Sequence, residues 1–73
     1  MTVLRLDDLH PDGIRIVVDW LRFRPGSSFF VPCLNLDECE KQVRRITARK
    51  KMQVETRICA EHNILGLRVW RIA

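Results

Sequence analysis

Basic side chains, with one tryptophan among them, are the candidate ligand-binding residues of this chain. Six lysines and arginines fall between residues 41 and 51, and further arginines flank Trp70. Such cations neutralise phosphates, and an aromatic ring beside a guanidinium group can stack on nucleobases. The sequence therefore predicts a surface that binds nucleic acid or an acidic protein. Its candidate residues are Lys41, Arg44, Arg45, Arg49, Lys51, Arg57, Arg68 and Trp70.

The distribution of charge along the chain favours an anionic partner. Residues 1–38 contain four arginines and six acidic residues, a net charge of −2. Residues 39–73 contain nine basic and three acidic residues, a net charge of +6, so that the whole chain carries +4. A basic half of this kind is typical of proteins that meet nucleic acid or an acidic protein surface. The acidic half, however, would repel a nucleic-acid backbone that crossed it.

The same basic residues also have a purely structural interpretation. Several gather toward the C-terminal end of the helix expected at Leu36–Lys50, where the helix dipole favours cations. In the expected hairpin, Trp70, Glu55 and Arg57 would form an ordinary salt-bridged and cation–π patch. No helix-turn-helix or zinc-finger pattern accompanies the cluster. Both interpretations therefore stay open from the sequence.

Catalytic and metal-binding patterns are weak. Neither histidine lies beside a plausible nucleophile with an orienting carboxylate, and the sequence has no glycine-rich phosphate loop. Cys59 and His62 have a C-x-x-H spacing that could join Cys33 and Cys39 in a metal site. Against such a site, Cys39 belongs to an apolar helix stripe, where a free thiol is a routine small hydrophobe. We expect a protein that is not an enzyme and that carries no metal or cofactor.

Cysteine usage and hydropathy predict where the protein works. An odd number of cysteines without a C-x-x-C pair indicates reduced thiols. The apolar start of the chain is too short for a secretory signal, and no apolar run approaches the roughly 20 residues that span a bilayer. We therefore expect a cytoplasmic protein without a membrane partner.

The helix at Leu36–Lys50 has the strongest local signals. Asn35 is a suitable N-cap, and Glu38 three residues later could complete a capping box by reaching back to it. An apolar stripe follows at helical spacing, and no glycine or proline interrupts the segment. The stripe consists of Leu36, Cys39, Val43 and Ile46.

The region after the helix predicts a β-hairpin. Apolar and polar residues alternate from residue 52 to 61, and His62-Asn63 could supply a two-residue turn, although a slightly longer loop is an alternative. In the two-residue register Ile58 faces Leu67. The face turned to the helix then carries Val54, Thr56, Ile58, Ala60, Leu65, Leu67 and Val69. The other face carries Glu55, Arg57, Cys59, Arg68, Trp70 and Ile72.

The first half of the chain is less regular. Turn residues up to Gly13 predict a loosely held arm over residues 1–13, which could also dock as an edge strand. Residues 14–23 are ambiguous between helix and strand, and the β-branched side chains favour a strand at about residues 14–20. A turn at residues 24–27 and a short apolar strand at residues 28–32 follow.

Together these elements predict a small α+β domain over residues 14–73, in the order β-β-α-β-β. A three- or four-stranded, mainly antiparallel sheet would have the helix packed on one face. Exposed sheet edges, and an uncovered Trp20, Phe23 or Trp70, make a homodimer a realistic expectation. The expected core consists of Phe29, Val31, Leu36, Val43, Ile46, Val54, Ile58, Leu67 and Val69.

Three segments carry a resemblance to a known group of proteins. They are Pro-Gly-Ser-Ser-Phe-Phe-Val-Pro-Cys at residues 25–33, Thr-Arg-Ile at 56–58 and Gly-Leu-Arg-Val-Trp-Arg-Ile at 66–72. In these segments the chain resembles small phage-encoded proteins of unknown function, over about residues 18–72. The resemblance implies a compact strand–strand–helix–hairpin domain in the cytoplasm of a bacterial host, and an acidic partner would then be a host protein. It implies no catalytic residue.

Overall fold

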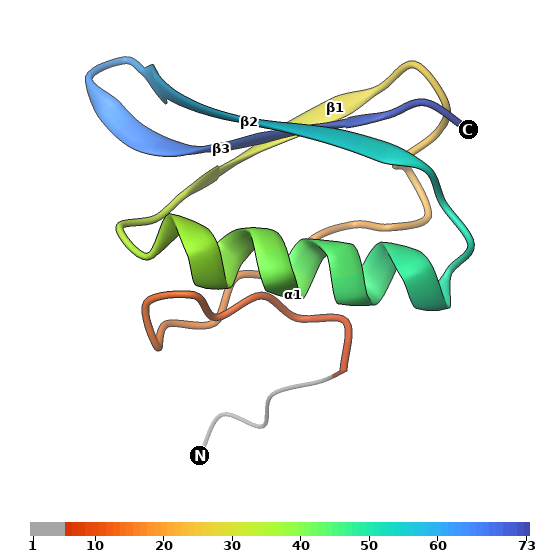
Figure 1. The fold of residues 1–73 in the computed structure, drawn as a ribbon, viewed down its shortest axis with the longest axis horizontal. Coiled ribbons are helices and arrows are strands. Elements are labelled where there is room, and N and C mark those ends of the chain that lie inside the picture. The colour runs from red at the N-terminus through yellow and green to blue at the C-terminus, as the bar shows by residue number, and fades with distance from the viewer. Residues whose placement is uncertain (1–5) are drawn as a thin grey trace.

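The computed structural model describes residues 6–73, and across them the chain forms one helix and three strands (Figure 1). The elements are β1 at Ser28–Pro32, α1 at Leu36–Arg49, β2 at Val54–Glu61 and β3 at Ile64–Arg71. The strands pair antiparallel in the order β1-β3-β2, so the last strand in the sequence is the central one. The α+β class is confirmed. The three-stranded alternative is the one observed among the described residues.

The hairpin forms as its turn chemistry predicts. His62 and Asn63 have φ angles of 52° and 64°, the left-handed values that a tight two-residue turn requires at both central positions. Glu61 therefore pairs with Ile64, and Ile58 lies opposite Leu67. The predicted register is confirmed along β2 and β3.

The N-terminus of α1 is capped by two residues that lie far apart in the sequence. The Asn35 side chain accepts a hydrogen bond from the Glu38 N–H at 3.2 Å, which confirms the predicted N-cap. The reciprocal half of the capping box is wrong, because the Asn35 N–H donates to Asp12 at 2.8 Å. Asp12 also accepts from the Leu34 N–H at 2.8 Å, and Glu38 instead accepts from Gln42. The segment before the sheet thus anchors the two residues that lead into the helix.

Residues 6–15 form a further layer, on the side of α1 that faces away from the sheet (Figure 1). Leu9 is fully buried there and exchanges two backbone hydrogen bonds with Ile16, at 2.9 and 2.6 Å. This isolated bridge replaces the strand predicted over residues 14–20, which is wrong. The loosely held arm is also wrong for residues 6–13, while residues 1–5 of that prediction lie outside the described residues.

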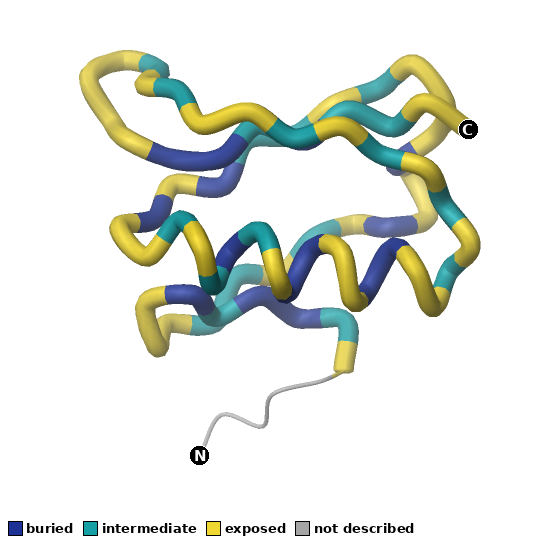
Figure 2. Tube along the Cα trace, in the orientation of Figure 1, coloured by how far each residue is buried: buried dark blue, intermediate teal, exposed yellow. Residues whose placement is uncertain are grey.

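The core lies on both sides of α1 (Figure 2). The predicted core residues Val31, Val43, Ile46, Leu67 and Val69 are buried, and Phe29, Leu36 and Val54 pack partly buried against them. The prediction for Ile58 is wrong, since its side chain is 54% exposed. The hairpin end of the sheet projects past the start of α1 (Figure 1).

Three aromatic rings close the core where the N-terminal segment meets β1. Trp20, Phe23 and Phe29 contact one another edge to face, with ring centroids 4.8 to 5.9 Å apart. The indole N–H of Trp20 donates to the Asp7 carbonyl at 2.8 Å. The expectation of an uncovered Trp20 or Phe23 is therefore wrong, because both are buried.

Within residues 6–73 the structure contains no helix with the length and hydropathy of a transmembrane span.

Candidate functional site

The structure divides the eight candidate residues between two separate faces. Four of them project from α1, and Lys51 follows the Lys50 C-cap of that helix. Arg57, Arg68 and Trp70 lie on the face of the sheet that α1 leaves uncovered, because they alternate with the core residues of β2 and β3. We call this second surface the open sheet face. The sheet separates the open sheet face from α1, so the eight residues do not form one continuous binding surface.

Arg68 is already engaged within the open sheet face. Its guanidinium group makes two hydrogen bonds of 2.5 Å to the Glu61 carboxylate and a third of 2.9 Å to the Ser28 hydroxyl. The same group lies 5.7 Å from the centroid of the Phe30 ring. The bond to Arg68 lowers the pKa of Glu61, and in turn Glu61 raises the pKa of Arg68. The guanidinium group of Arg68 therefore links β3 to Glu61 and Ser28 on the two neighbouring strands.

The rest of the open sheet face is balanced in charge. Arg57 lies directly opposite Arg68, is exposed, and has no ion pair among the described residues. Trp70 is half-buried and lies between Glu55 on one neighbouring strand and Ser28 on the other. Two carboxylates thus accompany two guanidinium groups, which leaves little net attraction for a polyanion.

The cations of α1 fall into a paired and an unpaired group. Arg44 is paired with Glu40 at 3.0 Å, and Arg49 donates to the Leu6 carbonyl at 2.7 Å. Lys50 pairs with Asp7 at 3.0 Å, and this contact lowers the pKa of the Asp7 carboxyl. Three exposed cations on α1 or just after it have side chains with no ion pair or hydrogen bond among residues 6–73. These three, which we call the helix cations, are Lys41, Arg45 and Lys51.

Four of the six acidic residues in the first half bind a cation or backbone N–H groups. Asp8 is buried and binds Arg15 at 2.7 Å, and Asp19 lies 3.4 Å from Arg22. Asp7 binds Lys50, and Asp12 caps α1 as described above. The repulsion that the sequence predicts for this half is therefore reduced, since these four carboxylates are compensated locally.

Acid is expected to destabilise the fold through two carboxylates. The pKa values of Glu61 and Asp7 lie below their ordinary values of 4.5 and 3.8 in the folded protein, because of Arg68 and Lys50 respectively. The unfolded chain then binds more protons in this range, so stability falls as pH drops below about 4.5 and through the folded pKa values. Urea unfolding followed by circular dichroism at a series of pH values measures this loss.

The double change Asp7→Asn and Glu61→Gln should make that pH dependence shallower. Glu55→Gln is the matched control, since it removes an exposed carboxylate that has no ion pair among the described residues. A dependence that stays equally steep in the double variant would contradict the assignment to these two pairs.

The cysteines pack as small buried groups. Cys33 and Cys39 are both buried, and a hydrogen bond joins their side chains. Burial raises the pKa of both thiols, to about 12 for Cys39, so neither is a ready thiolate. Cys59 lies apart on the hairpin, 3.7 Å from Glu61. Among residues 6–73 no three His, Cys, Asp or Glu side chains are grouped so that they could hold a metal ion.

Comparisons with protein-family models, with characterised proteins and with solved structures give no match to this chain. The assignment of function therefore depends on the geometry alone. Sequence reasoning missed the partners Asp7 and Glu61, which pair with Arg49, Lys50 and Arg68. Asp7 lies 42 and 43 positions before Arg49 and Lys50, and no local pattern marks contacts at that separation.

Proposed function

We propose that this chain is a small non-enzymatic protein that binds the phosphate backbone of nucleic acid through the helix cations. The observation that carries the proposal is that Lys41, Arg45 and Lys51 are exposed and lack a carboxylate partner within the described residues. Lys41 and Arg45 are one turn apart and therefore project from the same side of α1. An accessory or regulatory role stays a prediction, and so does the bacterial host that the phage resemblance implies.

Charge and chemistry support backbone contacts over base readout. Lysine and arginine that are free of internal partners release counterions when they meet phosphates, and this gives sequence-independent affinity. The aromatic residue of the candidate set, Trp70, lies on the opposite surface with charges that cancel. We therefore expect similar affinities for different base sequences.

The test is fluorescence anisotropy with labelled random duplex DNA and single-stranded RNA at several salt concentrations. If the three helix cations neutralise about three phosphates, log K should fall against log salt with a slope of roughly −2 to −3. Replacing Lys41, Arg45 and Lys51 with glutamine should remove most of that slope and lower the affinity at least about tenfold at low salt.

A matched control variant has the same net charge as the variant that lacks the three helix cations. Arg22, Arg24 and Arg57 are exposed arginines outside the helix cations, and their joint replacement with glutamine also removes three positive charges. This control should keep most of the slope. Equal losses in the two triple variants, or no binding by the wild type at low salt, would overturn the proposal.

An acidic host protein is the alternative partner, because it would meet the same unpaired charges. Capture from bacterial lysate with and without nuclease separates the two. Retention of nucleic acid that nuclease removes supports the proposal, whereas a nuclease-resistant protein together with absent anisotropy binding favours the alternative.

A further inference from the structure

β1 is an edge strand with a row of unused backbone groups. The Arg71 N–H donates to the Ser27 carbonyl at 3.0 Å, and the Cys33 N–H donates to the Leu65 carbonyl at 3.2 Å. Hydrogen-bonding direction alternates along an antiparallel strand, so Ser28, Phe30 and Pro32 direct their backbone groups away from β3. Within the described part of the chain these groups have no hydrogen-bond partner.

The two edges of the sheet differ in protection. β2, on one edge, carries the charged residues Glu55, Arg57 and Glu61, and charges on an edge strand discourage pairing with another chain. β1, on the other edge, has the sequence Ser-Phe-Phe-Val-Pro without a charge. Pro32 protects its end only in part, since proline lacks the N–H but keeps the carbonyl. The β1 edge is therefore the one open to strand addition.

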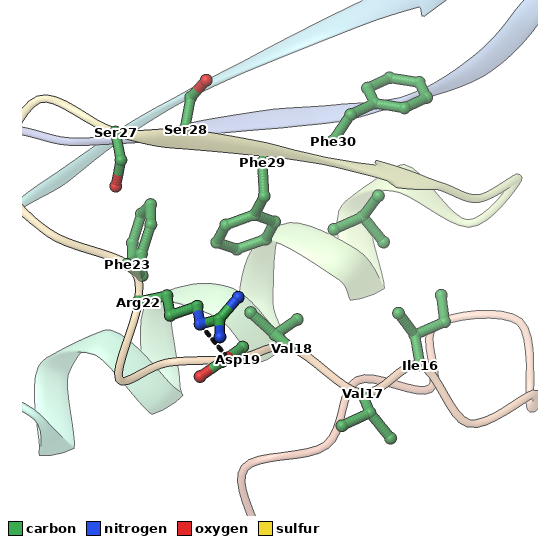
Figure 3. A pocket seen from close by; sticks show the side chains of 11 residues that line it. Ile16, Val17, Val18, Asp19, Arg22, Phe23, Ser27, Ser28, Phe29 and Phe30 are labelled. Carbon is green, nitrogen blue, oxygen red and sulfur yellow. Dashed lines mark ion pairs between the residues drawn. The ribbon is translucent and has the colours of Figure 1, made fainter.

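A groove runs beside this edge, between β1 and the segment that starts at Ile16 (Figure 3). Its volume is about 310 Å³. Phe29 projects from β1 toward Val18, while Phe30 points to the opposite side of the strand (Figure 3). A strand added to β1 would place alternate side chains over this groove, in contact with Ile16 and Val18, in the manner of β-augmentation.

We propose that the occupant is β1 of a second copy of this chain, paired antiparallel about a two-fold axis at Phe30. In this register the two Phe30 residues exchange N–H to carbonyl hydrogen bonds, and the Ser28 N–H of each copy donates to the Pro32 carbonyl of the other. The missing N–H of Pro32 removes half of each outer pair, and the rest of the ladder is intact. The two sheets become one continuous sheet across the dimer.

Charge favours a second copy at this place. Each chain carries +4, so two copies repel each other most where their unpaired cations approach. The helix cations and Arg57 lie on α1, just after it and on β2, not on β1. The charged residues that line the groove, Asp19 and Arg22, lie 3.4 Å apart as an ion pair and largely cancel. The uncharged β1 edge is thus where two like molecules meet at least electrostatic cost.

Sedimentation velocity over a wide concentration range tests the proposal. The wild type should approach twice the 8.6 kDa mass of the monomer at high concentration. Ser28→Pro removes the outward N–H at the first residue of β1, a position where an edge strand tolerates proline, and should shift the equilibrium to monomer. Ser28→Ala keeps that N–H while losing the hydroxyl contact to Arg68, so it should remain dimeric.

Val54→Pro is the matched change at the first residue of β2, on the opposite edge, and should also remain dimeric. Amide hydrogen exchange gives a local readout, since Ser28 and Phe30 should become protected as the concentration rises. A wild type that stays monomeric overturns the proposal. So does a dimer that survives Ser28→Pro, or one that Val54→Pro abolishes in a chain that circular dichroism shows to be folded.

Discussion

Gly66→Ala should lower the free energy of unfolding by about 3 kcal/mol or more, the range of severe overpacking. Gly66 lies in the central strand β3, beneath the ring of Phe30 on β1. A Cβ atom at this position would overlap the Val31 carbonyl oxygen and come within 2.6 Å of Cζ of Phe30. The ring could rotate away, but the carbonyl belongs to the backbone of the neighbouring strand. The methyl group therefore forces β1 and β3 apart.

Gly13→Ala is the matched control for Gly66→Ala. Gly13 has a φ of 83° and no atom within 4 Å of an added Cβ, so alanine meets backbone strain there without a collision. We expect this variant to lose only about 1 kcal/mol. Urea unfolding followed by tryptophan fluorescence measures both values. A loss at Gly66 no larger than the loss at Gly13 would contradict the close approach of the two strands.

Leu9→Ala should cost about 3 kcal/mol, as for a large-to-small substitution at a fully buried site. Leu9 is completely buried in the layer beneath α1, within the segment whose turn residues predict a loose arm. The alanine variant leaves a cavity that this layer fills only in part. A loss of this size is large for so small a domain, whose total stability is near the lower end of the usual 5–15 kcal/mol, by order of magnitude.

Leu21→Ala is the corresponding control, because Leu21 is 92% exposed in the same N-terminal segment. We expect a change within about 0.5 kcal/mol for that variant. Thermal unfolding followed by circular dichroism compares the two leucines directly. Equal and small effects would mean that residues 6–13 are not part of the folded unit.

Local signals explain which elements could be predicted from the sequence. The helix has its cap and apolar stripe within fifteen consecutive residues, and the hairpin has its turn and alternation within eighteen, so short-range chemistry determines both. The strand predicted for residues 14–20 is wrong because contacts distant in the sequence determine the conformation there. Their β-branched side chains favour a strand, but Ile16 forms only the bridge to Leu9 while Trp20 turns into the core. Long-range packing overrides local preference there.

The candidate binding residues show the same difference between features that depend on local sequence and features that depend on long-range contacts. The sequence predicts that Lys41 and Arg45 lie on the polar side of a helix and that Lys51 follows it. In the structure all three residues are exposed. The neutralisation of Arg49 and Arg68 depends on Asp7 and Glu61 respectively. The confirmed register sets Arg68 directly against Arg57, an unfavourable like-charge pair, and Glu61 compensates for it. That compensation depends on side-chain reach, which the register alone does not specify.

The position of β3 at the centre of the sheet has a consequence for folding during synthesis. β1 and β2 do not pair with each other, so neither has a strand neighbour until residues 64–71 have left the ribosome. Asp12 likewise has no partner until residues 34–35 are translated, and Asp7 has none until residues 49–50 are translated. Nascent chains stalled before β3 should therefore remain open to protease. The native contacts then form together in a late step that closes long loops.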